Sequence, residues 1–446
     1  MKSFINTLKN IYKIDELRTR ILNTLGFLLI YRLGSFIVLP GVDSEALQAA
    51  NGDPSGLAGL INIFAGGAFS RASIFALGIM PYISASIVMQ LLGLAIPHFQ
   101  RLQKEGESGR KKINQYTRFL TVLVTVLQAP GYIASQIPVT ARLHNDTLFW
   151  ASSIIILLAG TIFIMWLGEK ITDKGIGNGI SLIIMIGIIA NLPVAFIQEF
   201  VSRLENSGGG LVIFLVELVV LFLIIVVSIL LVQGTRKIPV QFAKKIVGAK
   251  QYGGVRQYIP LKVNAAGVMP IIFAQAIMFI PLTIAGFSES SSVNSFVTVI
   301  SDYTGFWHNL LFAVMIIAFT YFYTAITINP NQMADDMKRN GGFIPGVKPG
   351  KDTATFIDAV MSKITFPGSL FLAFIAILPA FATKMGINAQ FAHFYGGTSL
   401  LILVGVVLDT LQQIESHLLM RHYDGLMKNG RIRGRSNPSA VPMVTN

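Results

Sequence analysis

The sequence of 446 residues contains no cysteine and few charged residues. The absence of cysteine excludes disulfide bonds, cysteine-ligated metals and thiol nucleophiles. Charged residues make up 13% of the chain and hydrophobic residues 53%, with a mean hydropathy of +0.63. A soluble protein carries roughly 25% charged residues, so this composition lies outside that class. We predict a polytopic membrane protein.

Motifs for catalysis and metal binding are also lacking. None of the six histidines belongs to an H-x-x-x-H pair. The sequence contains no G-x-S-x-G elbow, H-E-x-x-H helix or phosphate-binding P-loop. The glycine-rich GIGNG at 175–179 has no preceding strand, so we interpret it as a tight turn before a helix. The prediction is a protein without enzymatic activity, cofactor or metal. The first 20 residues are basic but polar, so no removable signal peptide is expected.

Long apolar runs are abundant. A membrane-spanning helix needs about 20 mainly apolar residues. Ten runs qualify: 21–39, 73–97, 118–138, 148–168, 180–200, 210–233, 267–289, 306–328, 364–383 and 396–416. They are too continuous for the alternating strands of a barrel. An even split near residues 200–210 gives two halves of five spans that begin on opposite sides. Any similarity between the halves is therefore inverted, which places a working site near the midplane where they meet.

The basic residues are distributed very unevenly. Of the 35 lysines and arginines, 30 lie in the N-terminal arm, the C-terminal tail and alternate loops. The five exceptions are Arg32, Arg71, Arg142, Arg203 and Lys384. By the positive-inside rule, both termini and the basic loops are expected in the cytoplasm. The predicted regions are an arm (1–20), an N-terminal half (21–205), a C-terminal half (206–420) with cytoplasmic loops 234–266 and 329–363, and a tail (421–446).

The loop 234–266 carries seven basic residues and no acidic one. Contact with anionic lipid is the simplest explanation of this charge. A cationic hairpin of this length also suits the phosphates of ribosomal RNA or an acidic groove on a protein. Together with the loop 329–363, it is typical of a docking platform.

Four charged residues fall inside the predicted spans: Arg32, Glu217, Asp409 and Glu415. Intramembrane charges are rare and commonly functional. They leave open an ion-coupled secondary transporter, and they equally fit pairing between helices.

One stretch, INIFAGGAFSRASIFALGIMPYISASIVMQLL (61–92), begins with a short apolar segment that Gly66 and Gly67 interrupt before the span. Ile79 and Ile83 are spaced for one helical face, and Ile184 and Ile188 repeat that spacing. Isoleucine is common in any span, so the spacing alone does not indicate a pore.

The same stretch, with GIGNGIS (175–181), RKIPVQFAKK (236–245), PLKVNAAGVMP (260–270) and NPNQMADD (329–336), resembles the SecY/Sec61-alpha family. The resemblance extends over residues 10–430. It implies an all-α protein of the bacterial inner membrane, with ten helices in two inverted five-helix halves around an hourglass pore. Such a channel passes unfolded secretory polypeptides across the membrane and releases transmembrane segments sideways into the bilayer.

The resemblance also implies roles for particular residues. A hydrophobic pore ring corresponds to Ile79, Ile83, Ile184, Ile188, Ile272 and Ile402. A plug over residues 57–70 and its flank contains Ile61, Ile63, Phe64, Gly66, Gly67, Phe69 and Arg71. A lateral gate for departing helices includes Ser84, Gln90 and Ile280.

The remaining implications concern partners. These are the SecE and SecG subunits, the SecA ATPase, the translating ribosome, signal sequences and nascent polypeptides, and membrane lipids. Docking of the motor or ribosome is expected at Arg236, Lys237, Lys244, Lys245, Lys250, Arg256 and Lys348. The chain departs from the family at two places. Relatives often carry two adjacent arginines where this chain has Ala249–Lys250, and many carry an arginine where this chain has Lys348.

Overall fold

The computed structural model describes residues 14–50, 59, 62–143, 147–205, 210–242, 245–247, 250–252, 256–285, 302 and 304–428. Two of the predicted site residues, Ile61 and Lys244, lie outside these ranges, as does part of the predicted plug (57, 58 and 60). Most of the predicted arm and tail also lies outside. The side chains of Lys245, Lys250 and Ile280 are likewise not described.

A helix lies over each of the ten predicted spans. In chain order these are α2 (Asp15–Gly34), α5 (Met80–Ala95), α7 (Glu107–Gln136), α8 (Thr147–Lys174), α9 (Gly179–Glu205), α10 (Gly210–Gln233), α11 (Met269–Ala285), α13 (Phe306–Thr327), α15 (Lys351–Lys384) and α17 (Gly397–Lys428). Among the described residues, seven helices are long and apolar enough to cross a membrane alone. An eighth span results if α5 is counted with α6 (Pro97–Lys104), to which it is bent by 102°.

Several helix boundaries differ from the predicted ones. α7 begins at Glu107 and α15 at Lys351, well before the predicted edges at 118 and 364. These extensions are polar, and hydropathy detects only the apolar part of a helix. In contrast, α5 begins at Met80 and not at 73, because Pro81 occupies the first helical turn and Gly78 has a positive φ of 54°. Proline is favoured at the start of a helix, where its missing N–H costs nothing.

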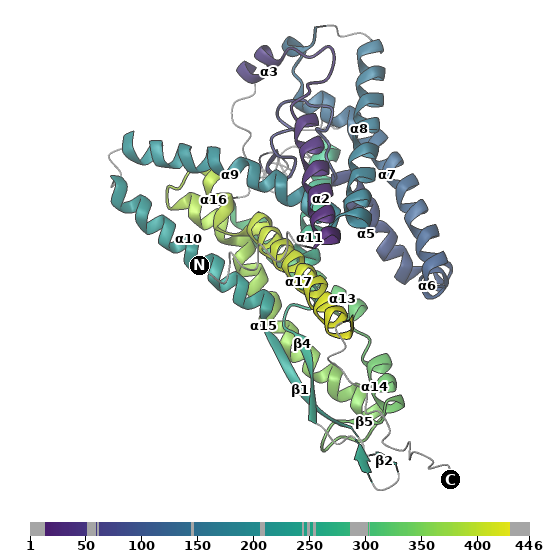
Figure 1. The fold of residues 1–446 in the computed structure, drawn as a ribbon. Helices are drawn as coiled ribbons and strands as arrows, with labels where there is room; N and C mark the ends of the chain where they lie inside the picture. The colour runs from purple at the N-terminus through teal and green to yellow at the C-terminus, as the bar shows by residue number, and fades with distance from the viewer. Residues whose placement is uncertain are drawn as a thin grey trace, which may run out of the picture.

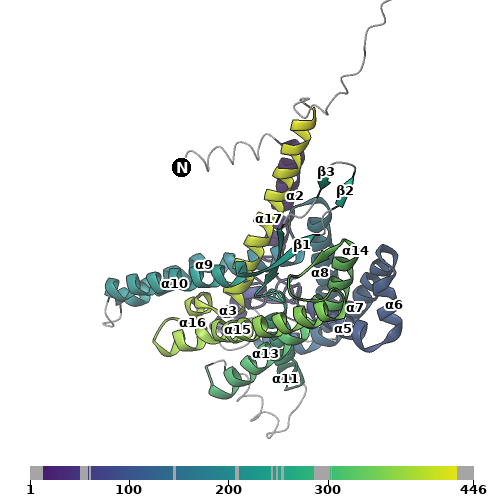
Figure 2. The same cartoon turned by 90° about the horizontal axis from the view of Figure 1, so that it is seen from below.

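The helices form two groups (Figures 1 and 2). In the first set, α5 packs on α7, α7 on α8, and both α2 and α9 on α8. In the second set, α11 packs on α13, α13 on α15, and α17 on both α10 and α15. The sets meet where α5 contacts α11 and where α9 contacts α10 and α17. One buried hydrophobic cluster lies within each set, and a third lies between them.

The two long basic loops fold together. β1 (Thr235–Phe242) pairs antiparallel with β4 (Arg256–Lys262) on one side and with β5 (Gly342–Phe343) on the other. β2 (Lys245–Val247) and β3 (Lys250–Tyr252) form a separate pair. These strands depart from the predicted all-α fold only outside the membrane. The alternation of Ile238, Val240 and Phe242 along β1 is the pattern expected of a strand with one buried face.

The buried face of this sheet rests on helices from the second loop. Its residues pack on α14 (Pro330–Arg339) and the start of α15, through Ile238, Val240, Leu261, Met337, Ile344, Ile357 and Met361. α14 begins at a side-chain cap, where Asn329 Oδ1 accepts hydrogen bonds from the backbone N–H groups of Asn331 and Gln332 at 3.1 and 3.3 Å. Such caps typically stabilise a helix by about 1 kcal/mol. We call this unit of β1, β4, β5 and α14 the loop domain, and the end of the bundle that carries it the basic end.

Short elements complete the described structure. They are α3 (Ser44–Ala50), η1 (Val139–Ala141), α16 (Ala389–Ala392) and η2 (His393–Tyr395). α16 and η2 connect α15 to α17 at the end opposite the loop domain (Figure 1).

Candidate functional site

Six isoleucines from four helices converge between the two sets. Ile79 precedes the first turn of α5 and Ile83 follows one turn later, while Ile184 and Ile188 lie on α9. The second set contributes Ile272 from α11 and Ile402 from α17. All six belong to the cluster between the sets: Ile79, Ile184, Ile188 and Ile402 are buried, and Ile83 and Ile272 are partly buried against it. The two one-turn spacings place each pair on one helical face.

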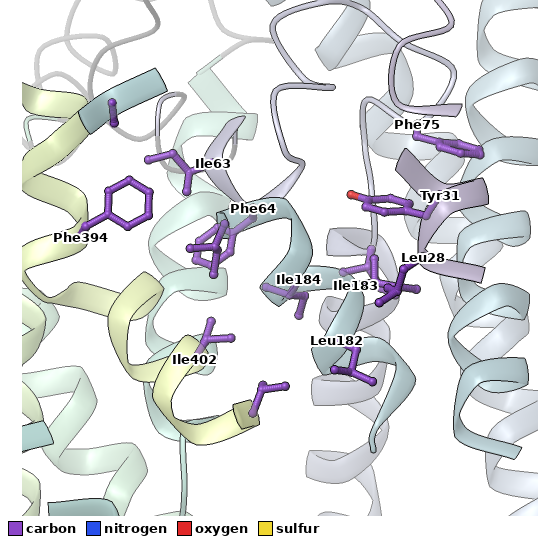
Figure 3. Close-up of a cluster of buried hydrophobic side chains, with 14 of the residues drawn as sticks. Leu28, Tyr31, Ile63, Phe64, Phe75, Leu182, Ile183, Ile184, Phe394 and Ile402 are labelled. Carbon is purple, nitrogen blue, oxygen red and sulfur yellow. The ribbon is translucent and has the colours of Figure 1, made fainter. Parts of the chain in front are cut away.

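Five of these isoleucines line one small cavity together with an aromatic ring. The lining consists of Ile79, Ile83, Ile184, Ile272 and Ile402, with Phe64, Met80, Ser84, Gln275 and Ala276. Its volume of about 20 Å³ is room for roughly one water molecule. Figure 3 shows Phe64 above Ile402, with Ile184 to its lower right, and all three belong to the same cluster. Ile188 is fully buried in the same cluster but does not line this cavity.

Phe64 belongs to a tightly folded stretch that we call the turn segment (residues 62–79). Gly66 and Gly67 both have positive φ, at 64° and 84°, a conformation that L side chains rarely adopt. The backbone N–H of Gly67 donates to the carbonyl oxygen of Asn62 at 2.8 Å, and the Asn62 side chain accepts from the N–H of Ser70 at 3.0 Å. The predicted break at the two glycines is therefore a closed turn.

Two arginines bind this turn. Arg71 donates to the carbonyl oxygens of Gly67 and Gly66 at 2.9 and 2.8 Å. Arg32, from α2, donates to the same oxygen of Gly66 at 2.6 Å. Both guanidinium groups lie over the ring of Phe36, at 4.7 Å for Arg32 and 4.4 Å for Arg71. These contacts explain how a charge inside the first predicted span is accommodated.

Further hydrogen bonds of the turn segment are also with the first set. Tyr132 of α7 donates to the carbonyl oxygen of Phe69 at 2.7 Å. On α9, Asn191 donates to the carbonyl oxygen of Ile63 at 3.4 Å, and a Cβ added at Gly187 would clash with the carbonyl oxygen of Phe64. Within the turn segment, Phe64 and, at its end, Ile79 line the cavity that the second set closes.

The predicted gate residues lie near the contact between α5 and α11. Ser84 lines the cavity and donates to the carbonyl oxygen of Met80 at 3.2 Å. Gln90 lies on the same helix and donates to Ser86 Oγ at 3.4 Å. Ile280 lies on α11. Sequence analysis missed Gln275, a buried amide whose Nε2 has no hydrogen-bond partner among the residues that the structure describes. An amide within an otherwise apolar helix was the available signal.

The predicted docking residues lie on the loop domain or beside it. The side chains of Arg236, Lys237, Arg256 and Lys348 are exposed, and they form no salt bridge with any described acid. Lys245 and Lys250 lie in the β2–β3 pair, in which Lys250 is opposite Val247. Lys237 lies on the face of β1 opposite the apolar residues that pack on α14 and α15, and Arg236 is exposed near the start of the strand.

The charges inside the spans do not meet at one site. Arg32 binds the turn segment, whereas Glu217 forms a salt bridge with Arg203 at 2.6 Å. Asp409 and Glu415 are exposed on α17. Sequence analysis did not anticipate the partnership of Arg203 with Glu217, because the two residues lie on different helices.

Known proteins resemble this chain over nearly its whole length. The SecY family model matches residues 73–411. Protein translocase subunit SecY of Streptomyces scabiei is 43% identical over 433 residues, covering 94% of this chain and 98% of the relative. The corresponding subunit of Halalkalibacterium halodurans is 44% identical over 435 residues, covering 95% and 99%.

Solved structures share the fold at low sequence identity. One is a SecY protein whose plug domain is described as stabilising the closed translocation channel and maintaining a membrane seal; its TM-score is 0.63 at 18% identity, with 94% of this chain and 95% of that one covered. Another is Sec61 from a canine ribosome–channel complex, with a TM-score of 0.58 at 16% identity and the same coverage. With the family model matching most of the chain, and ten helices in two sets closing on one apolar cavity, this protein belongs to the SecY family.

Proposed function

We propose that the chain is the central pore-forming subunit of a protein-conducting channel. It passes unfolded polypeptides across the membrane and releases transmembrane segments sideways into the bilayer. The observation that carries this proposal is the small apolar cavity between the two helix sets, lined by five isoleucines and Phe64. The first set corresponds to the N-terminal half (21–205) and the second to the C-terminal half (206–420).

The six isoleucines form the pore ring in this proposal. A hydrophobic constriction with space for about one water resists wetting and so blocks ions. Isoleucine offers branched apolar contact and no hydrogen bond, so the ring can surround many different side chains without retaining any of them. A polar or charged lining would bind some substrates too strongly to release them.

Residues 62–70 of the turn segment, which are the described part of the predicted plug apart from residue 59, supply the plug, with Arg71 at its flank. Its turn is held by Arg32 and Arg71, and Phe64 lines the cavity together with Ile184 and Ile402. The contacts of its backbone with the first set keep it in place while the second set closes the cavity. Removing Phe64 from the cavity would open the path through the ring.

The lateral gate lies where α5 meets α11, with Ser84, Gln90 and Ile280 along it. Separation of these helices would expose a translocating segment to lipid. An apolar segment then leaves the channel because transfer of apolar surface out of water is favourable. A charged segment remains in the channel, because moving charged side chains into the hydrocarbon has a large free-energy cost.

The loop domain is the proposed docking platform for partners in the cytoplasm. Its exposed Arg236, Lys237 and Arg256, with Lys244, Lys245, Lys250 and Lys348, suit the phosphates of ribosomal RNA and acidic surfaces of a motor. The Sec61 structure in a ribosome–channel complex supports a ribosomal partner. We extend the proposal to SecA as motor and to SecE and SecG as further subunits. No energy source is encoded in the sequence motifs, so the work of translocation falls to such partners.

The channel is placed in the bacterial cytoplasmic membrane with both termini in the cytoplasm. The bacterial relatives and the position of 30 of the 35 basic residues support this orientation.

An ion-coupled transporter is the second candidate. It would require the intramembrane charges to act together, yet Arg32, Glu217 and Asp409 lie at separate places in the structure. Loss of all activity on Glu217→Gln substitution, with the complex intact, would favour the transporter.

A crosslinking experiment tests the proposed channel. The chain has no cysteine, so one can be placed as Ile184→Cys in the buried cluster or as Val220→Cys on the exposed face of α10. A secretory precursor with one cysteine in its mature region is then stalled in membranes that contain the partner subunits. Disulfide formation at position 184 but not 220, dependent on ATP and the motor, is the expected result. Equal labelling at both positions, or none at 184 while translocation proceeds, contradicts the ring.

A further inference from the structure

The helix α9 is the last of the first set, yet it packs on both sets. Its N-terminal part makes close contacts with α8 and α2 of the first set, while the N–H of Gly177, just before the helix, donates to Gln413 Oε1 of α17 in the second set at 2.9 Å. The N–H of Gly179 donates to Thr172 Oγ1 at 2.9 Å, and the N–H of Ile176, just before the helix, donates to Thr24 Oγ1 at 3.0 Å. A Cβ at Gly179 would clash with the backbone of Gly168, so this approach of α8 and α9 requires glycine.

The C-terminal part of α9 is fastened to the second set by Arg203. Arg203 Nη2 contacts Glu217 of α10 at 2.6 Å and donates to the carbonyl oxygen of Gly386 at 2.8 Å. Arg203 Nε contacts Glu199 at 2.8 Å, and the other oxygen of Glu199 accepts from the N–H of Asn388, also at 2.8 Å. Glu199 is 1% exposed and Glu217 7%. A single guanidinium therefore links α9, α10 and the chain leading into α16.

Aromatic side chains reinforce the same link. Phe196 lies 5.3 Å from Phe214 of α10 and 6.2 Å from Phe391 of α16, measured between ring centroids. Phe200 lies 5.4 Å from Phe214. Edge-to-face pairs of this kind contribute stability beyond their buried area. Figures 1 and 2 show the corresponding part of α9 running beside α10, near α16.

Between the two parts stands Pro193, within the helix. A proline inside a helix removes one backbone hydrogen bond and clashes with the carbonyl group four residues earlier, so it is a natural point of bending. The contacts of α9 with the turn segment, at Gly187 and Asn191, precede Pro193. Those of the Arg203 cluster follow it.

We infer that α9 is divided between the two halves at Pro193. The part from Gly179 to Leu192 moves with the first set and carries the turn segment. The part from Pro193 to Glu205 moves with the second set, to which Arg203 holds it. The halves then separate by bending α9 at Pro193 and not by rotation at the connection between α9 and α10. This inference rests on the proposed opening between the halves.

The experiment measures distances between pairs of spin labels in the complete complex, idle and with a stalled precursor. Four exposed positions serve as label sites, substituted to cysteine in pairs: Leu127 on α7, Ile189 and Val201 on α9, and Leu215 on α10. The pair 127–215 reports separation of the halves. The inference expects 127–201 to change with it, while 127–189 and 201–215 stay constant.

The outcomes separate the inference from the proposed function. If 127–215 changes and 127–201 does not, the bend lies after Val201 and the division at Pro193 is overturned. If 127–215 stays constant in complexes shown by protease protection to contain the precursor, the halves do not separate, and the proposed opening itself fails.

Two variants test the mechanism. Pro193→Ala restores the missing backbone donor, so we expect it to reduce the change in 127–201 between the two states. Arg203→Gln should broaden the 201–215 distance distribution, whereas Arg203→Lys, which keeps the charge, should broaden it less. Arg118→Gln is the matched control, because Arg118 pairs with Glu169 between α7 and α8, entirely within the first set. Unchanged distributions in Pro193→Ala and Arg203→Gln would contradict the inference.

Discussion

The guanidinium of Arg32 donates a 2.6 Å hydrogen bond to the carbonyl oxygen of Gly66, although the two residues are 34 positions apart. This bond fixes the turn of the proposed plug to α2. Arg71 donates to the same oxygen from within the segment. The hydrogen bonds of the proposed plug are thus with the first set, and the second set contacts it through the apolar cluster that contains Ile63 and Phe64.

Substitution Arg32→Gln should loosen the plug. A hydrogen bond to a charged group is worth about 1.5–3 kcal/mol, so the open population should rise by roughly 10-fold or more. The measurement is ion conductance of the purified channel in planar bilayers without substrate. Arg18→Gln is the control, because Arg18 forms an exposed salt bridge with Asp15 on the same helix, and such pairs contribute little. Equal conductance in both variants would contradict the proposed anchor.

Substitution Gly187→Ala, on α9, should also displace the plug. The added Cβ would meet the carbonyl oxygen of Phe64, and overpacking of this kind costs about 1–3 kcal/mol. We expect a lower Tm and a higher resting conductance. Gly26→Ala is the matched control, because no atom of the described structure outside its own stretch of helix lies within 4 Å of its Cβ position. If the two variants behave alike, α9 does not hold the plug.

Substitution Ile402→Asn should let water into the cavity. The side chain is 3% exposed and lines the cavity with Phe64. An amide there offers hydrogen bonds to water at the proposed constriction, so resting ion leakage should increase. Val407→Asn, at a 39% exposed position of the same helix, should leave the leakage unchanged. If resting ion leakage does not increase in Ile402→Asn, the proposed hydrophobic seal at this cavity is contradicted.

Charge reversal on the loop domain should weaken ribosome binding. The double variant Arg236→Glu and Lys237→Glu places acids at two exposed positions of β1. Each lost phosphate contact reduces the slope of log K against log salt by about 0.7–0.9. Affinity is measured at several salt concentrations, with Lys384→Glu at the far end of α15 as control. If the double variant and the control give the same salt slope, the proposed contact of these residues with ribosomal RNA is contradicted.

Stability should fall in acid because of His393. Burial lowers the pKa of this side chain, which is 5% exposed, to about 4 from its ordinary value near 6.5. The imidazole binds a proton more readily in the unfolded chain than in the folded protein. The contribution of neutral His393 to the free energy of unfolding is therefore fully present above pH 6.5 and is lost as the pH falls toward 4. The contribution is about 3 kcal/mol.

The measurement is Tm in detergent between pH 7.5 and 4.5. The His393→Gln variant should show a shallower fall over this range than the parent. His98→Gln, at an exposed position of α6, should keep the parent's slope. A parental slope in His393→Gln would rule out this histidine as a source of acid sensitivity.

The position of each span follows from the sequence alone, and the side of each loop is predicted from it. Membrane insertion depends on local properties, namely a run of apolar residues and the basic residues beside it, and these are visible in the order of residues. The turn at Gly66 and Gly67 was also predictable, because glycine is needed wherever φ is positive. The polar starts of α7 and α15 were missed, because hydropathy is blind to helices outside the hydrocarbon.

Only the tertiary structure decided which distant side chains meet. The six isoleucines are ordinary members of four apolar helices until α5, α9, α11 and α17 bring them together. The partner of Arg203 could not be read from the chain, because Glu199 is a neighbour on the same helix but Glu217 lies on the next. Packing between helices depends on shape and on burial at many positions at once. The sequence therefore determined the helices and predicts their orientation, and the packing of the two sets determined the cavity and the hydrogen bonds from which the plug anchor and the division of α9 are proposed.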